Sequence, residues 1–231
     1  MNPKEYFRDW TRVIPYGEFR RVTEWLGKQN PKYICPSPEN IFKAFTLCTL
    51  RDCKSVFIGM DPYPDIYKGT KRATGILFGN VKDTPEDNIS PSLAVIKEAC
   101  INYEVPHQEL TFDNTLESWA KQGILMINSA LTCEVGKPGS HSLHWKLFME
   151  KLIANMSLHK TGITYVLFGV RAKALGRFID RNRNTVIEVE HPAYLARTGK
   201  KLSYDLFKVI GKSIKDNYDT DIEWYQEYKP I

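Results

Sequence analysis

The chain of 231 residues is 42% hydrophobic, 12% aromatic and 26% charged, a composition that excludes disordered, collagen-like and low-complexity classes. No apolar run approaches the roughly 18 residues of a membrane span, and the start MNPKEYFRDW lacks the features of a secretion signal, so we expect a cytoplasmic protein without a membrane segment. Lys and Arg number 32 against 27 Asp and Glu, a net charge of +5 that mildly favours a polyanionic partner.

The cysteine pattern predicts reduced thiols. The five cysteines are Cys35, Cys48, Cys53, Cys100 and Cys133. Their number is odd, and none of them forms a CxxC or CxxH pair of the kind that holds zinc. We therefore expect neither a structural metal nor an iron–sulfur cluster.

The first 53 residues have the apolar spacing of helices. A turn-rich segment, Pro31 to Pro38, interrupts this spacing, and a helix-like stretch follows from Glu39 to Leu50. No repeat or flexible linker marks a domain boundary anywhere in the chain. We therefore predict a single domain over residues 1–231, with residues 1–53 as its helical N-terminal part.

Short apolar, β-branched runs separated by helix-period stretches predict the core of the fold. The runs are Ser55–Gly59, Ile124–Ile127, Ile163–Phe168 and Thr185–Glu190, and the helical stretches start at Pro91, Ser142, Arg171 and Tyr204. Each run has the length and composition of a buried strand. Alternating strands and helices predict an α/β fold with a central four-stranded, mostly parallel sheet flanked by helices.

Polar side chains follow three of these strands. Asp61 comes shortly after Gly59, Asn128 directly after Ile127, and His191 directly after Glu190. Taken singly, each has an ordinary explanation as a turn or helix-capping residue. In open α/β sheets, however, ligands bind beyond the carboxyl ends of the strands. Together the three residues therefore predict a functional site at that edge.

The chemistry of this site is narrowed by what the sequence lacks. It has no GxSxG elbow, no Walker phosphate loop and no GxGxxG signature, so acyl transfer and nucleotide hydrolysis lose support. A carboxylate, an imidazole and an amide suit cleavage of a bond whose transition state has a cationic sugar and an anionic leaving base.

A series of motifs resembles the uracil-DNA glycosylases. They are GMDPYP within Pro36–Pro64, GILFGN (Gly75–Asn80), SPSL (Ser90–Leu93), LESWAKQGILMINSALT (Leu116–Thr132), GSHSLHW (Gly139–Trp145), VLFG (Val166–Gly169) and HPAYLAR (His191–Arg197). The resemblance covers nearly the whole chain. It implies a single α/β domain and a cofactor-free, monofunctional enzyme that removes uracil, its default substrate, from DNA.

The resemblance also implies roles for individual residues. Asp61 matches the carboxylate that orients the attacking water, and His191 the imidazole that stabilises the leaving base. The base-binding positions are Met60 through its backbone N–H, Tyr63 as the wall at C5, Phe78 as the stacking ring and Asn128 as the reader of the base edge.

The DNA-binding positions implied by the resemblance are Pro91, Ser92, Gly169, Leu195 and Arg197. Leu195 occupies the position of the wedge that replaces the base rotated out of the duplex. The expected partner is single- or double-stranded DNA, bound by a monomer.

The sequence departs from the family pattern at several positions. Met60 replaces the usual Gln and Pro64 the usual His, which makes GMDPYP closer to the poxviral form of the motif. Val170 and Ala193 stand where the family has phosphate-contacting serines, so Arg171 is a candidate substitute.

The connection from Tyr63 to Phe78 is longer than usual and carries Lys68, Lys71 and Arg72. It leads to an alternative, a glycosylase that removes a C5-modified pyrimidine from phage DNA in defence. Another alternative, from a different class, is a DNA-binding or processivity subunit that has kept the fold and lost catalysis.

Overall fold

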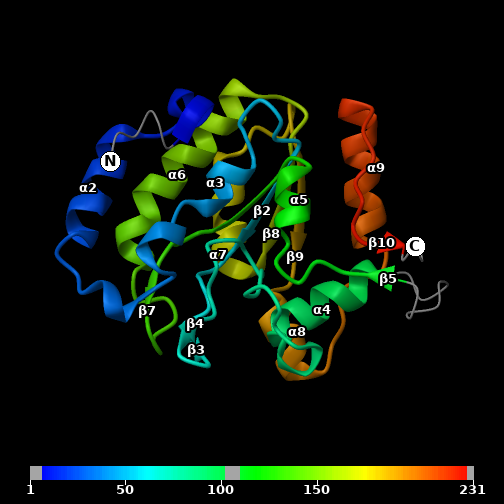
Figure 1. Ribbon diagram of the computed structural model, residues 1–231. Coiled ribbons are helices and arrows are strands. Elements are labelled where there is room, and N and C mark those ends of the chain that lie inside the picture. Colours follow the sequence, from blue (N-terminus) through cyan, green and yellow to red (C-terminus); the bar gives the residue numbers. More distant parts are fainter. Residues whose placement is uncertain (1–6, 102–109, 228–231) are drawn as a thin grey trace.

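Four parallel strands form the sheet at the centre of the molecule (Figure 1). The computed structural model describes residues 7–101 and 110–227. The strands are β2 (Ser55–Gly59), β6 (Ile124–Asn128), β8 (Thr164–Phe168) and β9 (Thr185–Val189), in the order β6-β2-β8-β9. The sequence prediction of four strands is confirmed, with the refinement that every neighbouring pair is parallel and Asn128 ends its strand.

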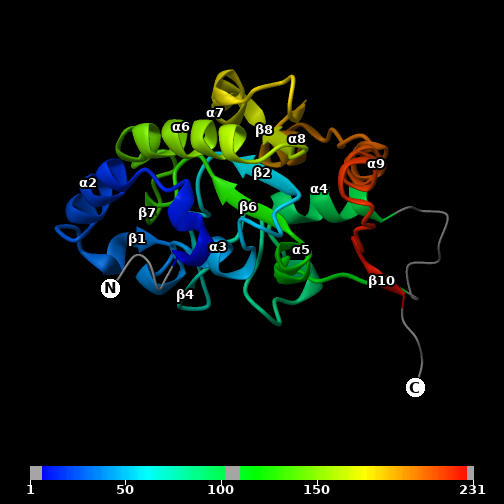
Figure 2. The same cartoon turned by 90° about the horizontal axis from the view of Figure 1, so that it is seen from above.

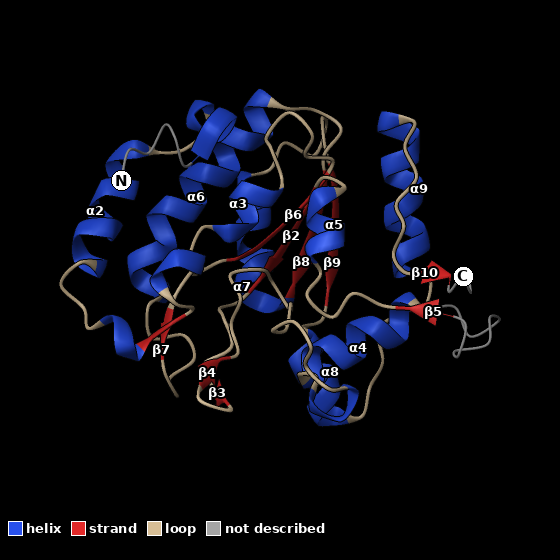
Figure 3. Cartoon of the chain, viewed as in Figure 1, coloured by secondary structure: helices blue, strands red, loops and turns tan. Residues whose placement is uncertain are grey.

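Alternate side chains of each strand enter two separate hydrophobic clusters, because successive residues of a strand point to opposite faces. In β2, Val56 and Ile58 pack on one side with α2 (Tyr16–Leu26), α3 (Lys43–Leu47), α6 (Ser142–His159) and α7 (Gly169–Lys173). Phe57 packs on the other side with α4 (Pro91–Cys100), α5 (Glu117–Lys121), α8 (Pro192–Thr198) and α9 (Leu206–Tyr218). Figures 2 and 3 show these helices flanking the sheet.

The N-terminal part is less helical than the sequence predicts. The expected helix over Glu39–Leu50 is reduced to a 3-10 turn, Pro38–Asn40, followed by α3. Within the predicted turn-rich segment, β1 (Ile34–Cys35) pairs antiparallel with β7 (Cys133–Glu134). Residues 1–6, which belong to the predicted helical part, lie outside the described residues.

The remaining short elements connect or close the main ones. The other 3-10 helices are Arg8–Arg12, Pro31–Tyr33, Glu86–Asn88 and Ala174–Phe178, and β5 (Leu110–Thr111) pairs with β10 (Gln226–Glu227). Helix α4 has the predicted start, α6 also begins as predicted, α7 begins two residues before Arg171, and α9 begins two residues after Tyr204. In the described part of the chain, no helix combines the length and apolar character that crossing a bilayer requires.

The long connection after Tyr63 forms a small hairpin. Strands β3 (Ile66–Tyr67) and β4 (Thr70–Lys71) pair antiparallel. The two residues between them, Lys68 and Gly69, have φ of 47° and 77°, which is the geometry of a tight two-residue hairpin turn. Figure 1 shows the hairpin projecting beyond the carboxyl end of the sheet, on the side where α4 and α8 also lie.

Candidate active site

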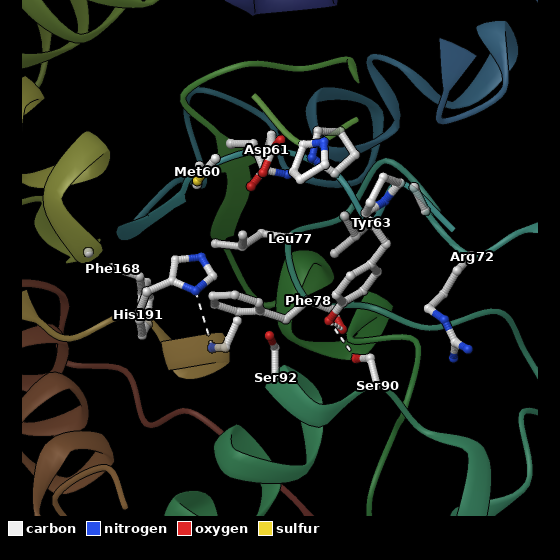
Figure 4. Close-up of a pocket in the computed structure, with 18 of the residues that line it drawn as sticks. Met60, Asp61, Tyr63, Arg72, Leu77, Phe78, Ser90, Ser92, Phe168 and His191 are labelled. Carbon is white, nitrogen blue, oxygen red and sulfur yellow. Dashed lines mark hydrogen bonds between the residues drawn. The ribbon is translucent and has the colours of Figure 1, made fainter. Parts of the chain in front are cut away.

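A cavity of about 890 Å³ opens at the carboxyl end of the sheet. Ten of the eleven site residues predicted from the sequence line it: Met60, Asp61, Tyr63, Phe78, Pro91, Ser92, Asn128, Gly169, His191 and Arg197. Figure 4 shows how the side chains from the different elements point into it. The structure therefore brings the predicted residues together from six separate segments of the chain.

The parallel register places the ends of the strands side by side. Gly59, the last residue of β2, pairs with Asn128, the last residue of β6. Beyond this point the backbone N–H of Ala130 donates to the carbonyl of Met60 at 3.0 Å, and the Ser129 hydroxyl donates to the same carbonyl at 2.7 Å. These bonds fix the start of the Met60–Tyr63 segment against the end of β6.

Asn128 is a buried amide with an unused acceptor. Its side chain is 9% exposed, and its Oδ1 atom finds no hydrogen-bond partner among the described residues. A Cβ on Gly59 would lie 2.8 Å from this oxygen and 2.3 Å from a methyl carbon of Leu77, so glycine is required there. Because an unpaired buried polar atom is costly, Asn128 is suited to a ligand that presents an N–H.

Asp61 is held as an acceptor at the wall of the cavity. The backbone N–H of Gly139 donates to its Oδ2 atom, and the carboxylate points toward the open space in Figure 4. Burial raises the pKa of Asp61, whereas the Gly139 hydrogen bond and the positive charge of Arg171 oppose this shift. A partly desolvated carboxylate of this kind can bind a water molecule and stabilise a neighbouring cation.

His191 is held as a neutral imidazole. Burial and, secondarily, the charge of Arg197 lower its pKa to about 4. Its Nδ1 atom accepts a hydrogen bond from the backbone N–H of Ala193 at 3.2 Å, which caps α8. Since Nδ1 is an acceptor, the single proton of the neutral ring is on Nε2, where it can be donated to a ligand.

Aromatic rings form another wall of the cavity. Phe78 makes edge contacts with Phe168, at 5.1 Å between ring centroids, and with His191, at 5.7 Å. Phe78 has a φ of 62°, a left-handed conformation that is unfavourable for a bulky residue. The packing around it sustains this strain and keeps the ring against the cavity.

Tyr63 is fixed by hydrogen bonds that the sequence did not reveal. Its hydroxyl donates to the carbonyl of Phe78 at 3.1 Å and accepts from the Ser90 hydroxyl at 2.6 Å. Burial raises the pKa of Tyr63 above its usual value, so the hydroxyl stays protonated. Asn80 secures Ser90 in turn, through a 2.7 Å bond to its backbone N–H and a 3.0 Å bond to its hydroxyl.

Ser90 and Asn80, which hold Tyr63 in place, are functional residues that the sequence analysis does not identify. The available signal was the position of Ser90 just before Pro91, which is typical of a helix N-cap, and Ser90 does accept from the Leu93 backbone N–H at 3.3 Å. Its second contact, with Tyr63, joins residues far apart in sequence and has no local signature.

Leu195 is the predicted site residue that does not line the cavity. Its side chain is 4% exposed and packs in the hydrophobic cluster that contains Leu93 and Ile96 of α4. The preceding residue, Tyr194, is 41% exposed and lines the cavity. Of these two neighbouring side chains, Tyr194 faces the cavity, whereas Leu195, the expected wedge, is buried.

Two further arginines lie at the cavity. Arg171 lines the cavity and lies near Asp61 and Gly139. Arg72, from the hairpin connection, is instead paired with Asp65 at 2.5 Å and lies over the ring of Tyr67 at 4.9 Å. The strands of the hairpin are absent from the cavity wall, although Arg72, Ala73 and Thr74 just after them line it. No group of three or more His, Cys, Asp or Glu side chains within residues 7–101 and 110–227 is arranged to hold a metal ion.

Comparison with known proteins places this geometry in a family. Residues 45–215 match the model of the uracil DNA glycosylase superfamily. The chain is 33% identical over 199 residues to a uracil-DNA glycosylase of Vibrio vulnificus, covering 85% of this chain and 84% of that protein. It is 32% identical over 225 residues to one of Haemophilus influenzae, covering 94% and 99%.

Solved structures agree. A mimivirus UNG variant, Y322F, crystallised in complex with UGI, superposes with a TM-score of 0.80 and 25% identity over 97% of this chain and 91% of that one. The UNG of Nitratifractor salsuginis superposes with a TM-score of 0.59 over 92% and 90%, and at 18% identity it supports the fold alone.

Proposed function

Because the chain belongs to the uracil-DNA glycosylase superfamily, we propose that it is a monofunctional DNA glycosylase that excises uracil and leaves an abasic site. The observation that carries this proposal is the meeting of Asp61, Asn128 and His191 in one cavity at the carboxyl end of the sheet. A DNA-binding subunit without catalysis would have no need of a desolvated carboxylate opposite a neutral imidazole.

Asn128 selects the base. Its Oδ1 accepts from N3–H of uracil, and its Nδ2 donates to O4. Cytosine presents an unprotonated N3 and an exocyclic amine at the same edge, so both hydrogen bonds would meet like partners. Phe78 stacks on the face of the base, and Tyr63 occupies the space at C5 that a methyl group would need.

Asp61 and His191 carry the hydrolysis. The bond between N1 of the base and C1′ of the sugar breaks, and its electron pair leaves with the base as the uracil anion. Asp61 stabilises the sugar cation and orients a water molecule, whose oxygen bonds to C1′ while its proton passes to the carboxylate and then to solvent. The Nε2–H of His191 and the backbone N–H of Met60 donate to O2 of the base, and these bonds strengthen as negative charge grows there.

The base reaches this cavity only outside the duplex stack, because its glycosidic bond is inaccessible within it. The loop at Pro91 and Ser92, the turn at Gly169 and the guanidinium of Arg197 bind the backbone on either side of the flipped nucleotide. Phosphate contacts of this kind position DNA without reading its sequence. The protein acts as a monomer in this proposal.

The fixed position of Tyr63 supports uracil over a C5-modified pyrimidine. Hydrogen bonds from two segments hold its ring at the wall, and of the additional basic residues Lys68 and Lys71 lie outside the cavity lining while Arg72 is paired with Asp65. A substituent at C5 would have to displace this ring.

The test is mass spectrometry of the free bases released by the purified protein. One DNA contains uracil, and a second is phage DNA with C5-modified pyrimidines. We expect uracil from the first DNA, no base from the second, and no release by Asp61→Ala. Release of a modified base with uracil untouched would overturn the substrate assignment, and uracil release by Asp61→Ala equal to wild type would overturn the mechanism.

A further inference from the structure

Helix α8 presents two different side chains to two different surroundings. Pro192 and Leu195 lie on its buried face, one turn apart, and Ala193, Tyr194 and Arg197 line the cavity. Leu195 points into the core and Tyr194, about 100° away around the helix axis, points to the cavity. The phase of α8 therefore decides which side chain meets DNA.

We propose that the ring of Tyr194 enters the duplex and fills the space that the flipped base leaves. This inference rests on the proposed function, since a flipped base is its premise. It assigns to Tyr194 the role that the family resemblance alone would give to Leu195.

Leu195 is held in the core by its surroundings. Its side chain packs with Leu93 and Ile96 of α4. Its backbone is fixed at both ends, since its N–H donates to the carbonyl of His191 at 3.2 Å and its carbonyl accepts from the backbone N–H of Lys200 at 3.0 Å. Bringing Leu195 to the surface would rotate α8 and disturb His191, which caps the same helix.

Tyr194 needs no such rearrangement. Its side chain is already 41% exposed, and its hydroxyl makes no hydrogen bond to another residue of the described segments. Lys200 lies 6.0 Å from the ring centroid, and Arg197 is one turn away on the same face. The aromatic ring is therefore flanked by cations that can bind the phosphates next to it.

The chemistry of the ring suits the position. Removing a base from the stack exposes the faces of its neighbours, and an aromatic side chain can stack on them whatever their identity. Tyr194 also follows His191 by only three residues, so a ring inserted in the duplex holds the flipped nucleotide over the catalytic imidazole. The role of Tyr194 is thus to position the substrate.

The experiment compares Tyr194→Ala, Tyr194→Phe and Leu195→Ala with wild type on the same uracil-containing sequence, single-stranded and double-stranded. Tyr16→Ala is the matched control, because Tyr16 is 43% exposed but lies on α2, on the opposite side of the sheet (Figure 1). The readout is the ratio of kcat/KM on duplex to kcat/KM on single strand. We expect Tyr194→Ala to lower this ratio roughly 10-fold to 100-fold, the range of one lost base–aromatic stack.

Tyr194→Phe keeps the aromatic ring and should have the wild-type ratio of duplex to single-strand kcat/KM. Tyr16→Ala should also leave this ratio unchanged. Leu195→Ala should lower the melting temperature and leave the ratio within about threefold of wild type, as expected for a core truncation. An unchanged ratio in Tyr194→Ala, or a greater fall in Leu195→Ala than in Tyr194→Ala, would overturn the proposal.

A second measurement separates this proposal from the proposed function. A duplex carrying 2′-fluoro-deoxyuridine, whose fluorine disfavours the sugar cation, is placed next to a fluorescent 2-aminopurine. Binding of wild type should change the 2-aminopurine fluorescence because the inserted ring disrupts the stack. Binding of Tyr194→Ala should produce a smaller change, because no ring is inserted. Equal signals from both proteins would refute insertion of Tyr194, whereas failure of wild type to release uracil from single-stranded DNA would refute the proposed function.

Discussion

Gly169 lies directly against the side chain of His191. A Cβ built on Gly169 would be 2.8 Å from the Cβ of His191, a distance that real side chains do not tolerate. Gly169 also has a φ of 80°, which L residues rarely adopt. The turn between β8 and α7 therefore needs glycine both for its backbone and for the position of the imidazole.

We expect Gly169→Ala to lower kcat for uracil release by about 10² because a displacement of roughly 1 Å at a reacting group has an effect of this size. Single-turnover kinetics on a single-stranded oligonucleotide measures it. Gly69→Ala is the matched control: Gly69 has a φ of 77° and nothing within 4 Å of the added Cβ. The control shares the backbone strain and should keep its activity, and equal losses in both variants would contradict the assignment.

The strands and the main cavity residues can be predicted from the sequence, because both are encoded by short stretches of neighbouring residues. Buried parallel strands are continuous apolar runs, as in Ser55–Gly59. The residues that follow parallel strands gather at one edge of the sheet, which is why the sequence alone identifies Asp61, Asn128 and His191 as site residues.

The contacts that complete the site depend on tertiary packing. The hydroxyls of Ser90 and Tyr63 meet across 27 positions of sequence, and no local pattern encodes this. The choice between Tyr194 and Leu195 depends on the rotation of a short helix against α4, whereas HPAYLAR shows only that two large side chains are adjacent. The β1–β7 pairing involves two residues per strand, too few to produce an alternating pattern.

The depressed pKa of His191 predicts the pH profile. An ordinary histidine takes up a proton near pH 6.5, but His191 has its pKa lowered to about 4. We therefore expect kcat/KM on single-stranded DNA to show no inflection near pH 6.5. Activity should decline only as the pH approaches about 4, where protonation would put a proton on Nδ1, break its bond with Ala193 and place a positive charge beside the sugar cation.

Protonation of Asp61 also lowers activity on the acid side. Burial raises its pKa, and the protonated form can no longer accept a proton from the attacking water. The measurement is kcat/KM between about pH 3.5 and pH 9 at constant ionic strength. An inflection near pH 6.5 that disappears in His191→Gln would show that the imidazole is not kept neutral by its surroundings.

The ring and the hydroxyl of Tyr63 have different roles, and two variants distinguish them. Tyr63→Ala should open the space at C5 and allow release of thymine as well as uracil. Tyr63→Phe keeps the ring and should still exclude thymine, but it removes the bonds with Ser90 and Phe78. Unsatisfied buried partners typically cost about 1–3 kcal/mol, so we expect a lower free energy of unfolding in Tyr63→Phe.

Mass spectrometry of released bases and denaturant unfolding measure the two effects. If Tyr63→Ala released uracil and still spared thymine, the methyl group would have to be excluded by another residue. Leu77 and Ser92, which also line the cavity, would then be the first candidates.

The charge of Arg171 should contribute to the salt dependence of DNA binding. Its guanidinium lies at the cavity near Asp61, next to Val170, which offers no hydroxyl to a phosphate. Each phosphate neutralised by a cation contributes about 0.9 to the slope of log K against log salt for duplex DNA, so Arg171→Ala should reduce the slope by about 0.9. Arg177→Ala is the control, because Arg177 is exposed and paired with Glu150 at 3.0 Å. Fluorescence anisotropy with an uncleavable duplex at several salt concentrations gives the slopes, and equal slopes for wild type and Arg171→Ala would remove Arg171 from the phosphate path.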